Sequence, residues 1–394
     1  MIKRIILKSL ITLRHEGVYV LIAKIFTYLD KRFRPDKYFH KIRFSSKRKY
    51  LLFISGEEKN STSYYRCEIP LKQLAKNGYD ADIVYYKFFS SDILKNYKHI
   101  IWYRLPLSLE LQREIEKIKR LKRKVIFSID DLLFDLDSIK SQSWLYRMYP
   151  DDREKFLNNV LDIKKFIKKS DLVIVTTDQL AHEINKIIKA PVLIHRNGYS
   201  SNELSIADKY YHMWPGIFNI GFFSGSQTHD DDLQIIATVI ARLFDEYSQL
   251  KLHLGGRINL PNSLIPFIGR VITYPYSCLE KYYQTLAKCS IILAPLVMNL
   301  HNQCKSEVRV IQAALVRRIV VASNTSAFRY AVKNNKTGYI IYKNDDWYDI
   351  IRHCLVNEIH TKKMGQLAYE RIKADYNPKQ LGTQLINFLE KYDK

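Results

Sequence analysis

Glycine and proline are scarce in this chain of 394 residues, at 13 and 11, and the chain has only five cysteines. With 47% hydrophobic residues, this composition excludes a disordered protein. The cysteines form no CxxC pair and no Cys/His spacing suited to zinc, which is typical of reduced thiols in a cytoplasmic protein. No signal peptide is evident, and no apolar run approaches the roughly 18 residues of a membrane span. We therefore expect an intracellular globular protein, long enough for two domains.

Acidic residues are few relative to basic ones, and the net charge of +23 is unevenly distributed. Residues 1–49 carry fourteen Lys and Arg against three acids, a net +11. The same segment has apolar residues at helical spacing, namely Ile2, Ile6, Leu10, Leu13, Val18, Leu21, Ile22, Ile25, Phe26 and Leu29. A basic amphipathic arm over residues 1–48 suits an anionic membrane surface, where each cation contributes about 1 kcal/mol. The alternative is a helix packed on the protein body with a solvated basic face.

Nucleic acid is the other natural partner of a basic chain. The sequence has no helix-turn-helix, zinc-binding or RNP-like pattern. We therefore expect no nucleic-acid partner.

Short apolar runs alternate with longer helical segments along the rest of the chain. The expected strands are 50–55, 81–86, 100–103, 125–129, 172–175 and 192–194, then 219–223, 250–254, 271–273, 291–294, 319–322 and 339–342. The expected helices are 68–77, 108–122, 151–169 and 178–188, then 231–247, 278–288, 305–315, 326–333, 345–356, 360–375 and 379–392. A polar stretch ending in Pro215-Gly216 separates the two halves and is typical of a connection.

This alternation predicts an α/β protein of two doubly wound, Rossmann-like domains facing a cleft. We assign residues 49–200 to an N-terminal domain and residues 201–376 to a C-terminal domain. Residues 377–394 form a final helix that we expect to pack back toward the N-terminal domain. Ligands of such sheets bind beyond the carboxyl ends of the strands.

A Lys-Ser-Glu triplet, residues 305–307, opens the helical run that follows the strand 291–294. A helix N-terminus offers unpaired N–H groups and a partial positive charge, so it attracts anions. The ammonium of Lys305 and the hydroxyl of Ser306 match a diphosphate. The alternative is an ordinary helix start, with Ser306 as N-cap and Glu307 in the first turn.

A second loop at a strand end, "GFFSGSQTHDDD", covers residues 221–232. Its small residues let a ligand approach the backbone closely. The candidates for a nucleotide site here are Gly225, Ser226 and His229. The three aspartates that follow are expected to complement the dipole of the next helix.

The second half, roughly 217–376, resembles the donor-binding domain of GT-B glycosyltransferases, especially the retaining group that builds bacterial surface polysaccharides such as O-antigen and capsule. The matching stretches are "LKLHLGG", "VITYPYSCLEKYYQTLAKCSIILAPL", "CKSEVRVIQAALVRRIVVAS" and "AVKNNKTGYII", with "SGSQTHDDD" and "NQCKSEVRVIQAA" typical of one subset. The first half is similar more loosely, through "STSYYRCEIPLKQLAKNGYD", "KVIFSIDDLLFD" and "HRNGYS". The resemblance implies that the C-terminal domain, 201–376, binds the nucleotide-sugar and that the N-terminal domain, 49–200, binds the acceptor.

The chain departs from the family's pattern of two glutamates eight residues apart, followed by Gly and Pro. Those positions hold Cys304, Gln312, Arg317 and Ile319. The resemblance then implies that Gln312 contacts the ribose, that Glu307 takes the sugar-facing role, and that Lys305 binds the diphosphate. It also places three first-half residues at the acceptor side of the cleft, where an arginine would assist with the phosphates. These residues are Tyr65, Arg66 and Arg104.

Asp130 and Asp131 follow the strand 125–129. They either cap a turn or face the cleft, where a carboxylate can orient or deprotonate an acceptor hydroxyl. Two DxD triplets, at 80–82 and 135–137, match the metal motif of the GT-A fold instead. That alternative leaves the second α/β domain unexplained, so we expect no metal and no other cofactor.

The resemblance implies a hexosyl transfer with retention, from a nucleotide-sugar to a lipid-linked or growing polysaccharide at the inner face of the cell membrane. Other polysaccharide-assembly proteins are possible partners under this interpretation. A second class stays open, because the replaced glutamates also fit a non-catalytic subunit that binds nucleotide-sugars or glycans in an assembly complex.

Overall fold

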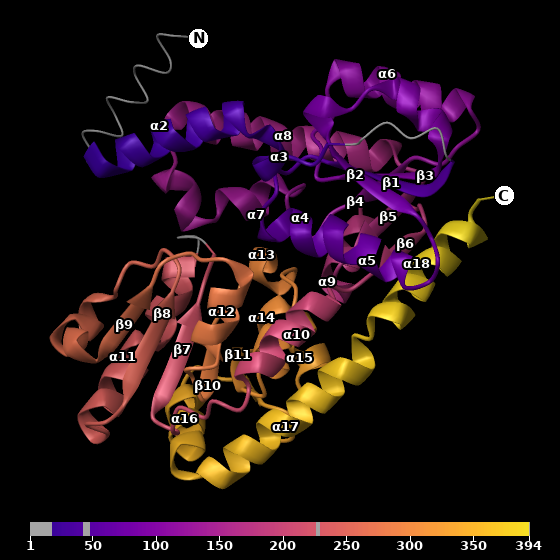
Figure 1. Ribbon diagram of the computed structural model, residues 1–394. Coiled ribbons are helices and arrows are strands. Elements are labelled where there is room, and N and C mark those ends of the chain that lie inside the picture. The colour runs from indigo at the N-terminus through magenta and orange to yellow at the C-terminus, as the bar shows by residue number, and fades with distance from the viewer. Residues whose placement is uncertain (1–17, 42–47, 226–228, 394) are drawn as a thin grey trace.

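The computed structural model describes residues 18–41, 48–225 and 229–393. These residues form two parallel six-stranded sheets, one in each half of the chain (Figure 1). The predicted fold class is confirmed, and all twelve predicted strands lie within three residues of their expected bounds.

The first sheet has the strand order β2-β1-β3-β4-β5-β6. Its strands are β1 (Lys49–Ser55), β2 (Ala81–Tyr85), β3 (Tyr97–Tyr103), β4 (Ile126–Ser128), β5 (Leu172–Val175) and β6 (Val192–Ile194). Residues 50–55 of β1 are all buried, as a parallel sheet covered on both faces requires.

Helices cover both faces of the first sheet. The helical segments of this half are α4 (Ser61–Ser63), the π-helical turn η1 (Tyr64–Glu68), α5 (Ile69–Ala75), η2 (Tyr86–Phe88), η3 (Ser91–Asn96), α6 (Leu109–Arg120), α7 (Leu136–Lys140), η4 (Ser143–Arg147), α8 (Pro150–Lys169) and α9 (Asp178–Asn185). Apolar residues of α6, α8 and α9 pack on one face, and those of η1 and α5 pack on the other.

The second sheet has the order β12-β11-β10-β7-β8-β9. Its strands are β7 (Asn219–Phe223), β8 (Lys251–Gly255), β9 (Val271–Tyr274), β10 (Ile291–Ala294), β11 (Ile319–Ser323) and β12 (Tyr339–Ile341). The helices are α11 (Asp230–Glu246), η6 (Asn262–Arg270), α12 (Leu279–Leu286), α13 (Leu300–Gln303), α14 (Val308–Leu315), α15 (Ser326–Ala331) and α16 (Asp346–Val356). Residues of α12, α14 and α15 bury one face, and those of α11 and α16 bury the other.

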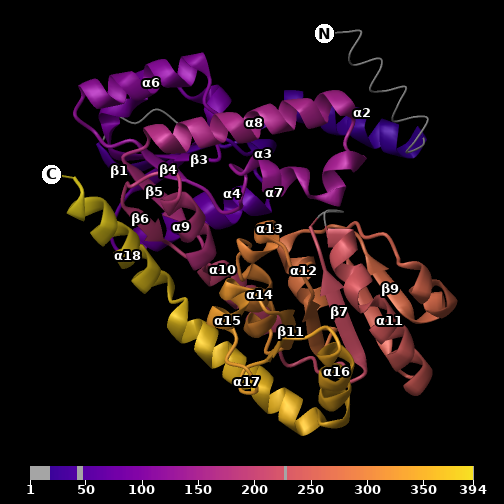
Figure 2. The ribbon, with the colours of Figure 1, turned by 180° about the vertical axis from the view of Figure 1, so that it is seen from behind.

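Two further segments join the domains. The polar connection contains a helix, α10 (Ser201–Tyr210), which its composition does not suggest. Ser200 and Glu203 form a capping box at its start, and this S-x-x-E pattern is the signal that a sequence reading needed. Helices α17 (Glu358–Asp375) and α18 (Pro378–Lys391) run along one side of the molecule (Figure 2). Leu385, Ile386 and Leu389 of α18 pack in the core of the first domain.

The described part of the basic arm is helical, as α2 (Val18–Phe33) and the short α3 (Pro35–Tyr38). Lys31 of α2 forms an ion pair with Glu58 at 2.5 Å, which attaches the arm to the first domain. The arm's residues 1–17 and 42–47 lie outside the described residues. Among the described helices, none has the length and apolar character to cross a membrane.

Candidate active site

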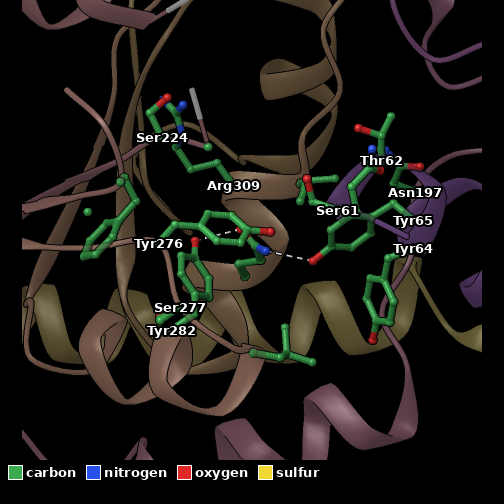
Figure 3. A pocket seen from close by; sticks show the side chains of 18 of the residues that line it. Ser61, Thr62, Tyr64, Tyr65, Asn197, Ser224, Tyr276, Ser277, Tyr282 and Arg309 are labelled. Atoms are coloured by element: carbon green, nitrogen blue, oxygen red, sulfur yellow. Dashed lines mark hydrogen bonds between the residues drawn. The ribbon is translucent and has the colours of Figure 1, made fainter. Parts of the chain in front are cut away.

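A cleft of about 1080 Å³ lies between the carboxyl ends of the two sheets. It is lined by residues of both domains, including α4 and η1 on one side and the start of α14 on the other (Figure 3). Parallel sheets place ligand sites at this edge, and most of the predicted candidates line the cleft.

Two cations of the second domain line the cleft. Lys305 lies in the turn between α13 and α14, because the helix begins at Val308, three residues later than predicted. Arg309 follows in the first turn of α14. One guanidinium nitrogen of Arg309 is buried without a hydrogen-bond partner among the described residues, and burial lowers the pKa of the group. The sequence analysis missed Arg309, although it lies four positions after Lys305.

Ser306 and Gln312 also line the cleft, and each forms a hydrogen bond with a residue of the first domain. The Ser306 hydroxyl accepts a hydrogen bond from Asn197 at 3.0 Å. The side-chain nitrogen of Gln312 donates to the hydroxyl of Tyr65 at 2.7 Å, and its oxygen accepts from Tyr282 at 2.8 Å. Dashed lines in Figure 3 mark these two hydrogen bonds, which end at the hydroxyls of Tyr65 and Tyr282.

The loop after β7 leaves room for a ligand. Gly225 lines the cleft, and a Cβ placed there would have no heavy atom within 4 Å. Gly256, on the neighbouring loop, has a φ of +100°, and a Cβ there would lie 1.8 Å from a backbone oxygen. Glycine is therefore required at 256. The predicted Ser226 lies outside the described residues.

His229 lines the cleft, and its Nδ1 lies 2.6 Å from a carboxylate oxygen of Asp232. Burial lowers the pKa of His229 and outweighs the hydrogen bond to Asp232, which raises it. The imidazole therefore favours its neutral form and adds little charge to the cleft.

The acidic pair faces these groups from the first domain. Asp130 and Asp131 both line the cleft at the end of β4. Arg104 holds them from behind, donating to Asp130 at 2.5 Å and forming an ion pair with Asp131. Tyr103 donates to Asp130 at 2.9 Å. Burial raises the pKa of Asp130.

The pKa of Asp131 moves the other way. Burial raises it, but the nearby charges of Lys305 and Arg104 outweigh burial and lower the pKa overall. Asp131 is therefore a carboxylate at neutral pH, held by a cation of each domain.

Besides Arg104, two predicted residues lie behind the cleft and are not among its lining residues. The guanidinium of Arg66 is buried and donates to the backbone oxygen of His195 at 2.8 Å and to Asn197 at 3.1 Å. Glu307 is fully buried and accepts from Tyr376 at 2.7 Å, with Arg196 at 3.5 Å. Arg66 therefore joins parts of the first domain, whereas Glu307 contacts Arg196 across the junction of the two domains.

An aromatic wall that the sequence analysis did not single out completes the site. Tyr274, Tyr276 and Tyr282 line the cleft from the end of β9, the loop that follows it and α12. The Tyr276 side chain is 68% exposed, so its ring presents an open apolar face. Such a ring is suited to stacking on a planar heterocycle.

No protein-family model matches the chain, and no curated protein matches it. Solved structures do. HepE from Anabaena, crystallised with UDP and glucose, is 13% identical at a TM-score of 0.62, over 87% of this chain and 100% of that one. Sucrose-phosphate synthase from Thermosynechococcus elongatus is 12% identical at 0.59, over 87% and 99%. A glycosyltransferase from Rickettsia africae is 12% identical at 0.56, over 88% and 99%.

The chain has the GT-B fold. This excludes the GT-A alternative, and the two DxD triplets have structural partners instead. Asp135 caps α7 by accepting from the Ser138 N–H at 2.8 Å. Asp82 accepts from Lys49 at 2.8 Å.

Proposed function

We propose that this GT-B chain is a glycosyltransferase that moves a hexosyl group from a nucleotide-sugar to a lipid-linked or growing polysaccharide of the bacterial cell surface. The observation that carries the proposal is the pair of cations, Lys305 and Arg309, beside an aromatic wall on one side of the cleft. Cations match a diphosphate, and an aromatic ring matches a nucleobase. The UDP-glucose complex of HepE, a protein of the same fold, supports a nucleotide-sugar as the donor.

The donor's diphosphate would lie at Lys305 and Arg309, near the N-terminus of α14. As the bond to the sugar breaks, negative charge develops on the leaving diphosphate, and fixed cations in a cleft stabilise it without reorganisation. These groups supply the charge that a metal ion supplies in other transferases, so we propose that no metal is required.

Asp130 and Asp131 would face the acceptor. A carboxylate here can accept a hydrogen bond from the attacking hydroxyl and orient it. Asp131 is the better candidate for this contact, because Asp130 is already bonded by both Tyr103 and Arg104. Retention of anomeric configuration is part of the proposal and follows the family resemblance.

Nucleotide release tests the proposal. Purified protein is incubated with UDP-, GDP- and dTDP-sugars and a lipid-linked or synthetic acceptor. We expect release with one donor class, and a loss of at least about 100-fold in Lys305→Ala, in the range found when a stabilising group is removed from a transition state. Lys336→Ala, at an exposed position outside the cleft lining, is the matched control. Binding without release under every donor would instead favour the non-catalytic subunit.

The arm supports a place at the inner face of the cell membrane. On α2, apolar side chains at helical spacing are exposed to solvent, with Phe26 at 67% and Phe33 at 77%. The others on this face are Ile22, Ile25 and Leu29. Basic residues, including Arg32 and Arg34, are exposed on the same segment. A helix with an uncovered apolar face and a basic face binds anionic lipid in the plane of the interface.

Vesicle sedimentation tests the arm. We expect the full chain to bind vesicles that contain phosphatidylglycerol, and the double variant Phe26→Ser, Phe33→Ser to bind at least about tenfold more weakly, since each buried Phe contributes roughly 1.5–3 kcal/mol. Leu109→Ser is the control, because Leu109 is 80% exposed on α6, a different helix. Equal binding by all three proteins would contradict the proposal.

A further inference from the structure

A directed hydrogen-bond chain links the cleft to the connection between the domains. Gln312 donates to the hydroxyl of Tyr65 at 2.7 Å, and that hydroxyl donates to a carboxylate oxygen of Glu203 at 2.8 Å. Tyr65 belongs to the first domain, Gln312 to the second, and Glu203 to α10 between them. The chain therefore exists only while the two domains stand as they do here.

Glu203 is surrounded by donors. Its carboxylate has no exposed surface and accepts from Tyr64 at 3.1 Å, Tyr65 at 2.8 Å, Tyr283 at 3.1 Å and the backbone N–H of Ser200 at 2.9 Å. A carboxylate can only accept, so Tyr65 and Tyr283 each donate their single hydroxyl proton to Glu203. The Tyr65 oxygen is then left as an acceptor for whatever stands at position 312.

These donor and acceptor assignments explain why position 312 holds an amide. The Gln312 nitrogen supplies the donor that Tyr65 needs, and the Gln312 oxygen takes the proton of Tyr282. A glutamate at 312 would bring two acceptors together in a buried place, one hydrogen bond away from Glu203. An unmatched buried polar contact of this kind is costly.

The fixed amide has two groups left for a ligand, one N–H and one oxygen lone pair. Gln312 lies three residues after Arg309 on α14, so both side chains are on the same face of the helix. A nucleotide held by Arg309 would then present its sugar hydroxyls to an amide whose orientation the first domain sets.

We infer that Tyr65 and Glu203 are positioning residues of the donor site, holding Gln312 ready for the hydroxyl groups of the bound nucleotide only when the domains are closed. This inference rests on the proposed function. It makes nucleotide binding and domain closure favour each other, because the same amide takes part in both.

Affinity for UDP, GDP and dTDP, measured by calorimetry on the full chain, tests the inference. We expect Tyr65→Phe to weaken binding of the preferred nucleotide by about tenfold. Tyr283→Phe is the matched control, because Tyr283 donates to the same oxygen of Glu203 but neither lines the cleft nor contacts Gln312. Its effect should be less than about twofold. Thermal unfolding of each variant checks that it is folded.

A double-mutant cycle separates positioning from general stability. In a Gln312→Ala background, adding Tyr65→Phe should have no further effect on nucleotide affinity. Gln312→Glu should weaken binding, and Glu203→Gln added to it should restore part of the loss, because one carboxylate and one amide are again paired through Tyr65.

Three results would overturn the inference: equal effects of Tyr65→Phe and Tyr283→Phe, additive effects in the cycle, or no restoration by Glu203→Gln. Each leaves the proposed function standing if the wild-type protein binds a nucleotide. Failure of the wild type to bind any of the three would overturn both.

Discussion

Lys305 and Asp131 line the cleft from opposite domains, and the charge of the ammonium helps to lower the pKa of the carboxyl. The cation proposed to bind the donor and the carboxylate proposed to face the acceptor therefore interact electrostatically across the cleft. Because the two charges favour each other, removing either one changes what the other does.

The first prediction concerns Asp131→Asn. We expect turnover to fall by about 100-fold, the scale of a lost acid–base or orienting group. Nucleotide affinity should stay the same or rise by a few fold, since a negative charge near the diphosphate is gone and Lys305 is released from it. Steady-state rates and calorimetry measure the two quantities. A parallel loss of affinity and rate would show that Asp131 acts only by holding the fold.

The second prediction concerns Arg309. Arg309→Ala should weaken nucleotide binding by roughly tenfold or more, because one nitrogen of its guanidinium has no partner among the described residues and is placed to donate to the diphosphate. Arg309→Lys should recover only part of the affinity, since an ammonium lacks the planar fork that grips two oxygens. Affinity is measured by calorimetry, with Lys336→Ala as the control. Full recovery by lysine would contradict a two-point contact.

The sheets were predictable because their signal is local. Runs such as residues 291–294 and 319–323 are apolar enough to name a buried parallel strand without knowledge of any neighbour. Helix α10 was missed because its sequence is polar and its cap was not counted. The strand ends then brought Lys305, Asp130 and Asp131 to one cleft, as parallel topology demands.

Side-chain roles were less predictable, because partners distant in sequence decide them. Nothing near Arg66 in the sequence shows that residues 195 and 197 will enclose its guanidinium. In the same way, Glu307 turns to Tyr376, nearly seventy residues later. Both were predicted to lie in the site, whereas in the structure neither is among the lining residues of the cleft.

The third prediction concerns closure of the cleft. Arg147 of the first domain bonds to Asp230 at 3.0 Å and to Asp231 at 3.2 Å, at the start of α11 in the second. Arg147→Ala should open the cleft, raising the radius of gyration in X-ray scattering and the ratio of donor hydrolysis to transfer, because closure excludes water. Lys155→Ala, an exposed cation on α8, is the control. Unchanged scattering and an unchanged ratio would remove this pair from the closing mechanism.

The fourth prediction concerns acid stability through His195, which is buried at the domain junction. Burial, together with the charge of Arg66, lowers the pKa of His195 to about 3. The unfolded chain binds a proton near pH 6.5, so the native state loses stability as the pH falls from about 6.5 toward 3. The loss is about 1.4 kcal/mol per pH unit, or roughly 2 kcal/mol at pH 5.

His195→Gln should remove this pH dependence, because a side-chain amide binds no proton in this range. The amide can still donate to the backbone oxygen of Leu381, which lies 3.2 Å from the imidazole Nε2. Urea unfolding at pH 8, 7 and 5 measures the effect. We expect the variant and the wild type to behave in parallel between pH 8 and 7, and the variant to lose roughly 2 kcal/mol less between pH 7 and 5. An identical loss in both would show that His195 is protonated in the folded protein, and hence that the junction admits water around it.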